Sequence, residues 1–302
     1  MSGGRPHRPL PSLRFRRIRA LALLVVLVTV IWMSIHLVKG GPADASAGGS
    51  GEQSQPAAPP PPTSESATAQ LNETLAQRGA GVRGRMSVAV TDLGTGVTAA
   101  YGSPEDSYVT ASIVKVDILA TLLLQREGQL TKSQRVAAQR MIQASDNGAA
   151  TTLWRQIGKA EGLREANLRF GLTSTVGGKG GRWGTTTTTA ADQLQLLRTV
   201  FAEDSPLNAS SRAYLQSLMG SVVPDQDWGV SAADTRPGED FYVKNGWLPR
   251  SKGWVVNSIG SVEYQGHTLL MVSLSDGRPA RDIGVTVSEG AALDAAGAVT
   301  GV

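Results

Sequence analysis

The chain has 302 residues, enough for one large domain or two small ones, and its lack of cysteine excludes disulfides, thiol nucleophiles and thiolate metal sites. The net charge of +4 is unevenly spread: residues 1–40 hold seven of the 29 basic residues and none of the 25 acidic ones, which leaves the rest of the chain at −3. A body with this charge offers no basic surface, so we expect no nucleic-acid partner.

The first predicted element is a membrane anchor. Ala20–Val38 is uncharged and rich in Leu, Val and Ile, and is long enough to cross a bilayer as a single-pass helix. The basic arm at residues 1–19 predicts that it stays in the cytoplasm and that everything after Lys39 is extracytoplasmic. The alternatives are a cleaved signal peptide, with Ala43-Asp44-Ala45 as a small-x-small site, and a twin-arginine export signal at Arg16-Arg17. In each case the body of the protein is exported, and it is secreted if the signal is cleaved.

A linker is predicted at residues 39–66, which are dominated by Gly, Ala, Ser and Pro. Five of the 15 prolines fall between Pro56 and Pro62, a run that favours an extended, semi-rigid spacer. We expect this linker to hold a globular domain, residues 67–302, away from the membrane.

The pattern of this domain predicts a helix, two strands, a block of helices, three strands and a last helix. The predicted helices are 67–78, 112–126, 132–145, 151–157, 162–170, 189–201, 210–219 and 285–296. The predicted strands are 86–90, 97–101, 241–244, 254–262 and 267–274. This order indicates an α/β fold of the α+β type, with one antiparallel sheet built from both chain ends and a helical subdomain between them.

Ser112 and Lys115 stand at the start of the most apolar predicted helix. Their spacing puts both side chains on one face, one turn apart, and the residues that follow through Leu124 are apolar almost all the way round. Burial disfavours an ammonium ion and lowers the pKa of a lysine, and a neutral lysine can take the proton of a neighbouring hydroxyl. The alternative for an isolated pair of this kind is a capping serine followed by a lysine that extends to solvent.

Two further motifs complete a set of groups that acyl transfer needs. Ser145-Asp146-Asn147 is predicted to close the helix that begins near Lys132, and Lys244 is predicted to end a strand. Acyl transfer requires a nucleophile, a base, a proton donor for the leaving nitrogen and an oxyanion site.

Each residue of this set has an expected catalytic role. Ser112 is the candidate nucleophile and Lys115 is its base. Ser145 can relay a proton to the leaving nitrogen, Asn147 can offer its amide to Lys115 and to the substrate, and Lys244 can supply positive charge for a substrate carboxylate. His267 stands alone in the exported part, inside an apolar strand, which argues against a Ser-His-Asp mechanism and against zinc; no cofactor is expected.

Ser-x-x-Lys, Ser-Asp-Asn and Lys-x-Gly in this order resemble the motifs of penicillin-binding proteins and class A β-lactamases, from about residue 67 to the C-terminus. The resemblance implies a β-lactamase/transpeptidase-like fold and a serine acyl-enzyme formed with β-lactams or peptidoglycan stem peptides. It also implies an oxyanion hole made by the backbone N–H groups of Ser112 and Trp247. Asn245, Gly246, Trp247 and Arg250 are the expected substrate-binding residues, although Arg250 could also be a loop charge.

The sequence departs from that family at three places. The interval between Ser112 and Ser145 is short, which implies a trimmed helical subdomain, and Asn245 stands where the family has threonine. Residues 175–183 form a short glycine-rich loop without the Glu that activates the deacylating water in the β-lactamases. We therefore expect slow deacylation. Two alternatives stay open: a true β-lactamase with a different base, and a non-catalytic protein that binds the cell wall.

Overall fold

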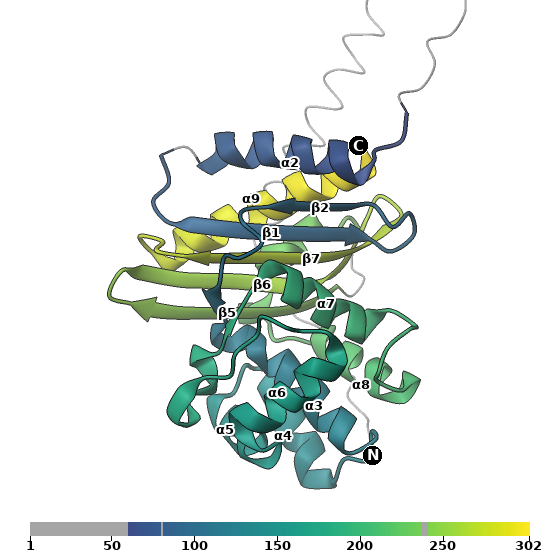
Figure 1. The fold of residues 1–302 in the computed structure, drawn as a ribbon, viewed down its shortest axis with the longest axis vertical. Coiled ribbons are helices and arrows are strands. Elements are labelled where there is room, and N and C mark those ends of the chain that lie inside the picture. Colours follow the sequence, from purple (N-terminus) through teal and green to yellow (C-terminus); the bar gives the residue numbers. More distant parts are fainter. Residues whose placement is uncertain (1–59, 80, 237–240) are drawn as a thin grey trace, which may run out of the picture. The chain divides into compact units, whose positions relative to one another are not determined.

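A five-stranded antiparallel sheet forms the centre of the computed structural model, which describes residues 60–302 except residue 80 and residues 237–240. Its strand order is β2-β1-β7-β6-β5 (Figure 1). The strands are β1 (Arg85–Asp92), β2 (Thr98–Tyr101), β5 (Tyr242–Arg250), β6 (Gly253–Tyr264) and β7 (His267–Asp276). A separate short pair joins β3 (Tyr108–Val109) to β4 (Thr187–Thr188). The predicted sheet built from both chain ends is confirmed.

Helices cover both faces of the sheet. They are α2 (Ser64–Gly79), α3 (Val114–Gln125), α4 (Lys132–Gln143), α5 (Asn147–Gln156), α6 (Lys159–Phe170), α7 (Ala190–Phe201), α8 (Ala209–Met219) and α9 (Arg281–Thr300). The chain's first and last described helices, α2 and α9, pack together against the sheet, and the helical block that contains α3 lies on its other side (Figure 1). This block is the helical subdomain that the sequence predicts.

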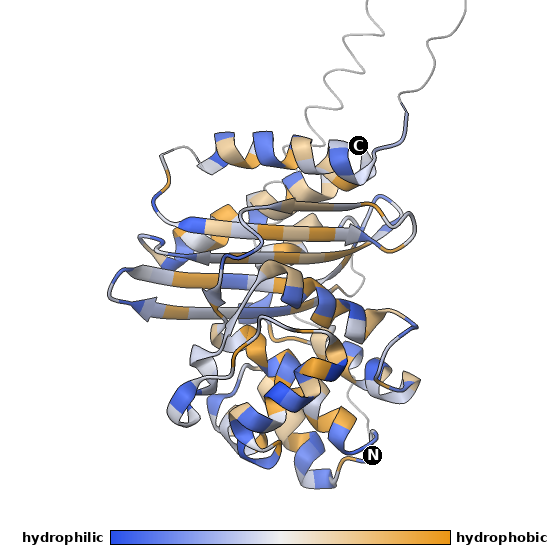
Figure 2. Cartoon of the chain, viewed as in Figure 1, coloured by the Kyte–Doolittle hydropathy of each residue, from blue (hydrophilic) through white to orange (hydrophobic). Residues whose placement is uncertain are grey.

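Alternation along the strands divides the hydrophobic core in two. On β7, Leu269 and Met271 belong to the core shared with α2 and α9, whereas Leu270 and Val272 belong to the core of the helical block. Successive side chains of a strand point to opposite faces, so a strand buried on both sides carries a continuous apolar run. Figure 2 shows the resulting hydrophobic stretches in the strands. The sheet is thus the middle layer of the domain, and β5 is one of its two edge strands.

Several element boundaries differ from the prediction, and two of these differences have a clear cause. Helix α2 begins inside the predicted linker, because Thr63 and Ser66 cap its start: the Ser66 N–H donates to Thr63 Oγ1 at 3.2 Å and the Thr63 N–H donates to Ser66 Oγ at 2.9 Å. Lys244 does not end its strand. β5 continues to Arg250, because the residues after Lys244 keep pairing with β6 as far as Gly253.

The expectation that Ser145-Asp146-Asn147 closes a helix is also corrected. Helix α4 ends at Gln143, and Ser145 has a φ of 54° in the left-handed region, which breaks the helix. Asp146 then caps the next helix, α5, by accepting the Ala149 N–H on Oδ1 at 2.7 Å. The motif is therefore a strained junction between two helices.

The predicted membrane segment at residues 20–38, the basic arm before it and residues 39–59 of the linker lie outside the described residues. Among the helices of the described part of the chain, none is both long enough and apolar enough to cross a bilayer.

Candidate active site

The side chains of Ser112 and Lys115 meet as the spacing predicts. Ser112 lies in a short 3₁₀ helix, Ala111–Ile113, that leads directly into α3, and the Lys115 Nζ is 3.0 Å from the Ser112 Oγ. Lys115 is completely buried, while Ser112 is only half-buried. Ala111, just before the serine, has a φ of 48°, a backbone conformation that costs a non-glycine residue roughly 1–2 kcal/mol. The serine hydroxyl thus reaches solvent with a buried amine behind it.

The β-sheet fixes the segment that carries the serine. The Asn257 side chain, on β6, donates to the carbonyl oxygens of Val109 at 2.8 Å and Thr110 at 3.1 Å. Strand β5 approaches so closely that a Cβ on Gly246 would lie 2.6 Å from the Ser112 backbone nitrogen. Only glycine fits there. Sequence analysis assigned no role to Asn257; a polar residue inside an apolar strand was the signal.

The Lys115 amine is surrounded by acceptors from the junction between α4 and α5. Its Nζ donates to the Ser145 carbonyl at 2.6 Å, to the Ser145 Oγ at 3.0 Å and to the Asn147 Oδ1 at 2.9 Å. Burial lowers the pKa of Lys115 to about 7, and the negative charge of Asp146 offsets part of that effect. Near neutral pH a large fraction of Lys115 is therefore an uncharged base.

Lys244 reaches the same hydroxyl from the sheet side. Its Nζ lies 3.1 Å from the Ser145 Oγ and donates to the Asn245 carbonyl at 3.0 Å. Burial, followed by the nearby charge of Lys115, holds the pKa of Lys244 well below its usual range. The Ser145 Oγ thus bridges two amines, which is the arrangement that a proton relay requires.

The face of β5 opposite Lys244 carries Asn245 and Trp247. The Asn245 amide donates to the carbonyl oxygens of Gln226 at 2.7 Å and Trp228 at 2.9 Å, so this buried side chain is committed to the backbone. The rings of Trp247 and Trp228 form a tilted pair with centroids 5.9 Å apart.

A cation that the sequence analysis missed completes this aromatic pair. The guanidinium carbon of Arg281, the first residue of α9, lies 4.3 Å from the Trp247 ring centroid and 5.8 Å from that of Trp228. No motif marks Arg281, and only the packing of α9 brings it to Trp247. Arg250, by contrast, lies exposed at the far end of β5, about 20 Å from Lys244 at the usual rise of a strand. The structure does not bring Arg250 to the site.

His267 takes the structural place that its surroundings predict. Its Nδ1 lies 2.8 Å from the Asp92 Oδ2, and Asp92 also accepts from Gly94 N–H and Thr95 Oγ1 in the turn after β1. This cluster ties the start of β7 to that turn.

The glycine-rich loop brings an aromatic ring to the site. The centroid of the Trp183 ring lies 4.8 Å from the Lys115 Nζ. Among the described residues, Asp146 is the carboxylate whose charge acts on Lys115, and its two oxygens are occupied by the Ala149 N–H and by the Arg140 guanidinium at 2.6 Å. The arrangement offers a base for the serine but no free carboxylate beside it.

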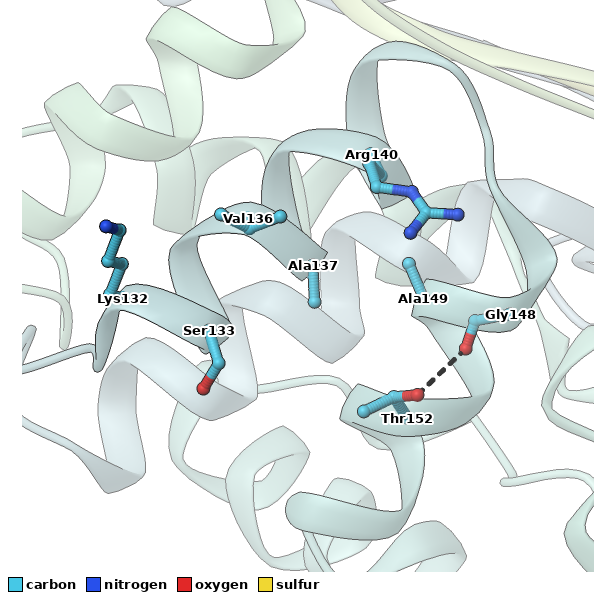
Figure 3. Close-up of a pocket in the computed structure, with 8 residues that line it drawn as sticks. All are labelled: Lys132, Ser133, Val136, Ala137, Arg140, Gly148, Ala149 and Thr152. Carbon is cyan, nitrogen blue, oxygen red and sulfur yellow. Dashed lines mark hydrogen bonds between the residues drawn. The ribbon is translucent and has the colours of Figure 1, made fainter.

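A separate hollow of about 700 Å³ lies between α4 and α5. Figure 3 shows its lining, which includes Lys132, Val136 and Thr152. None of the candidate catalytic side chains lines it, so this hollow is distinct from the site around Ser112.

Comparison with known proteins identifies the class. A family model described as "Beta-lactamase enzyme family" matches residues 129–297, more than half of the chain. The chain therefore belongs to the β-lactamase enzyme family. The match includes Ser145, Asn147 and Lys244 but begins after Lys115. The contact between Ser112 and Lys115 therefore supports a serine site independently of this match.

Curated relatives match part of the chain in sequence. The chain is similar to "Putative lipoprotein LppW" of Mycobacterium tuberculosis and Mycobacterium bovis, with 31% identity over 172 residues, 54% of this chain and 54% of each relative. The chain thus spans about half the length of the curated relatives it matches.

Solved class A β-lactamases share the architecture. The enzyme from Bacteroides cellulosilyticus has a TM-score of 0.67 at 13% identity, covering 78% of this chain and 99% of that one. The enzyme from Mycobacterium abscessus has a TM-score of 0.62 at 19% identity, covering 74% and 97%. At these identities the likeness establishes the β-lactamase-like fold alone.

Proposed function

We propose that this chain is an exported serine hydrolase that forms an acyl-enzyme at Ser112 with β-lactams or peptidoglycan stem peptides. The observation that carries the proposal is the 3.0 Å contact between the Ser112 Oγ and a buried Lys115 whose pKa is about 7. A lysine with its ordinary pKa would be almost fully protonated at neutral pH and could accept no proton. This one is poised to act as a general base.

The proposed acylation steps use these contacts and, for the oxyanion hole, the resemblance to the family. Neutral Lys115 takes the Ser112 proton as the Oγ attacks the substrate carbonyl, and the backbone N–H groups of Ser112 and Trp247 receive the oxyanion. Protonated Lys115 passes that proton to the Ser145 Oγ, which gives its own proton to the leaving nitrogen. Asn147 holds Lys115 and would also contact the substrate amide. The C–N bond breaks, and the substrate's acyl group stays on Ser112.

Charge in the substrate would be met from both sides of β5. Lys244 is buried, and a carboxylate beside it would restore its ammonium form, because an opposite charge favours the ionised state. On the other face, Arg281 presents a guanidinium, whose planar set of N–H donors matches a carboxylate. The Asn245 amide is occupied by backbone carbonyls, so we do not assign it to the substrate carboxylate. We assign this role to Arg281, which lies over the Trp247 ring and is the second cation after Lys244.

Slow deacylation distinguishes this proposal from a true β-lactamase. The second step needs a base for an attacking water, and Lys115 has no free carboxylate beside it in the described part of the chain. General-base assistance is typically worth about 10²–10⁴-fold in rate. The acyl-enzyme should therefore persist, as it does in a penicillin-binding protein.

Pre-steady-state kinetics with a chromogenic cephalosporin test the proposal. We expect a burst of one product per enzyme followed by very slow turnover. Sustained fast hydrolysis without a burst would instead support a β-lactamase with a different base. No reaction at all would support a non-catalytic cell-wall-binding protein.

Location is a separate part of the proposal. We infer that residues 20–38 anchor the protein and hold the domain on the extracytoplasmic side. The name of the mycobacterial relatives, a putative lipoprotein, supports attachment to a membrane, although this chain has no cysteine to carry a lipid. Full-length protein should fractionate with membranes and expose residues after Lys39 to external protease. A mature N-terminus near Ser46 would show cleavage instead.

A further inference from the structure

Trp183 occupies a defined position beside the candidate base. Its ring centroid lies 4.8 Å from the Lys115 Nζ, and its Nε1–H donates to the Thr151 Oγ1 at 3.1 Å. Thr151 in turn donates to the Asn147 carbonyl at 2.9 Å, and the Asn147 side chain accepts from Lys115. The indole is therefore fixed relative to the same residues that hold the lysine.

The backbone of the loop is anchored as firmly as the ring. The Thr110 N–H, two residues before the nucleophile, donates to the Thr186 carbonyl at 2.8 Å, and the Thr186 N–H donates to the Trp183 carbonyl at 3.0 Å. The Gly178 N–H donates to the Thr186 Oγ1 at 3.1 Å, and a Cβ at Gly178 would lie 2.1 Å from the Arg182 carbonyl oxygen. The glycines thus permit a tight turn that presents Trp183 to Lys115.

The ring is an apolar neighbour of the Lys115 amine, which is fully buried. Four oxygen atoms of Ser112, Ser145 and Asn147 accept from the Nζ, and the indole face is a further neighbour. An ordered water needs two to four polar partners, and an aromatic face supplies none. Water is thereby kept from the space next to the base.

From these contacts we propose that Trp183 is a positioning residue that excludes the deacylating water and so prolongs the acyl-enzyme. This role rests on the proposed function, since it presupposes acylation of Ser112. Removing the indole would open a space lined by the Lys115 Nζ and the Thr151 Oγ1, polar groups that can hold a water. From there, neutral Lys115 could take a proton from the water as the water oxygen attacks the ester carbonyl. The bond between the acyl carbon and the Ser112 Oγ then breaks, Lys115 returns the proton to the Ser112 Oγ, and the free acid leaves.

Hydration of this space has a second consequence. Burial is the main cause of the low pKa of Lys115, so water beside the amine would stabilise its charged form and raise that pKa. The pH dependence of acylation should therefore move to higher pH when the ring is removed. A ring with a purely structural role would leave this profile unchanged.

Four full-length proteins test the proposal: wild type, Trp183→Ala, Trp183→Gln and, as a matched control, Trp183→Phe. Stopped-flow assays with a chromogenic cephalosporin give the burst and the pH profile of acylation, and intact mass gives the lifetime of the adduct. We expect Trp183→Ala to shorten the lifetime about tenfold or more at an unchanged burst amplitude and to shift the acylation profile upward. Trp183→Phe keeps an apolar cover and should stay within about twofold of wild type.

Trp183→Gln tests the same role if the alanine variant is unstable. The glutamine amide fills part of the space left by the indole and can still bind water. Adducts of equal lifetime in wild type and in a folded Ala or Gln variant would overturn the role of Trp183 while leaving the acyl-enzyme intact. The absence of any adduct in the wild-type protein would overturn both the proposed function and this role.

Discussion

The two walls of the site differ in chemistry. The lysine wall, formed by Ser112, Lys115, Ser145, Asn147 and Lys244, is a continuous set of hydrogen bonds in which hydroxyls and amines can move a proton and the Asn147 amide holds Lys115. The loop wall, residues 177–186, brings an indole to the same lysine and no carboxylate. Acylation needs only the first wall, whereas fast deacylation needs a water held by the second. The difference indicates that one fold can keep the first half of a hydrolytic cycle and suppress the other half.

The largest expected effect comes from breaking the lysine wall. Lys115→Ala removes the base, and we expect the acylation rate to fall by about 10²–10⁴-fold in stopped-flow assays. Because Lys115 is fully buried, its replacement by alanine could also destabilise α3. Lys115→Met serves as a control, since methionine keeps the apolar part of the side chain. An acylation rate within threefold of wild type in both folded variants would remove Lys115 from the mechanism.

The pH dependence of acylation sharpens the same point. Only the neutral form of Lys115 can accept the serine proton, so the rate should rise with pH and level off above its pKa of about 7. Below pH 7 we expect about a tenfold loss per pH unit, measured as burst rate while circular dichroism confirms the fold. Asn147→Asp places a negative charge beside the amine and should move the profile to higher pH. A flat profile between pH 5 and 9 would contradict the assignment.

A third prediction concerns Asp117, on the side of α3 away from the nucleophile. Its carboxylate is buried against the Asn167 amide at 3.1 Å, and burial raises the pKa of Asp117 to about 7. Because the folded state keeps this proton to higher pH than the unfolded state, the protein loses stability as pH rises from about 4 to 7. Asp117→Asn cannot ionise and should exceed wild type by about 1–3 kcal/mol at pH 8 and by little near pH 4.

Urea denaturation at the two pH values measures this difference. Burst kinetics of the same variant at pH 8 should match wild type, because Asp117 contacts none of the reacting groups. A difference in stability that is the same at both pH values would show that Asp117 does not titrate in this range.

The smallest effect is expected at the substrate's carboxylate. Arg281→Ala removes a cation from the Trp247 face, and we expect the concentration of cephalosporin needed for half-maximal acylation to rise about three- to tenfold at unchanged burst amplitude. Arg250→Ala is the matched control, since Arg250 lies exposed at the distant end of the same strand. Equal effects of the two substitutions would show that Arg281 acts only through general charge.

Sequence could predict those features of the site that depend on short spacings. Ser112 and Lys115 meet because three residues of helix separate them. Short apolar runs between turn residues were enough to predict the five strands of the sheet. The ends of elements were harder to predict. The residues after Lys244 do not reveal that β5 continues, because its length depends on pairing with β6.

Residues brought together by tertiary packing could not be found in this way. Arg281 reaches Trp247 only because α9 packs on the sheet. Asn257 reaches Thr110 only because β6 lies beside the segment that precedes Ser112. The lack of a carboxylate in the loop can be read from the sequence, but the place of Trp183 beside Lys115 depends on contacts with Thr151 and Thr110 from two other elements. Such contacts leave no periodic signal in the sequence.

The central claim, a persistent acyl-enzyme at Ser112, is tested most directly by the intact mass of the full chain after incubation with a penicillin. Wild type should gain one penicillin mass per chain, and the adduct should persist for many times the acylation time after excess drug is removed. Ser112→Ala should gain none under the same conditions. An unchanged mass in wild type, or an adduct of equal yield in Ser112→Ala, would contradict the account.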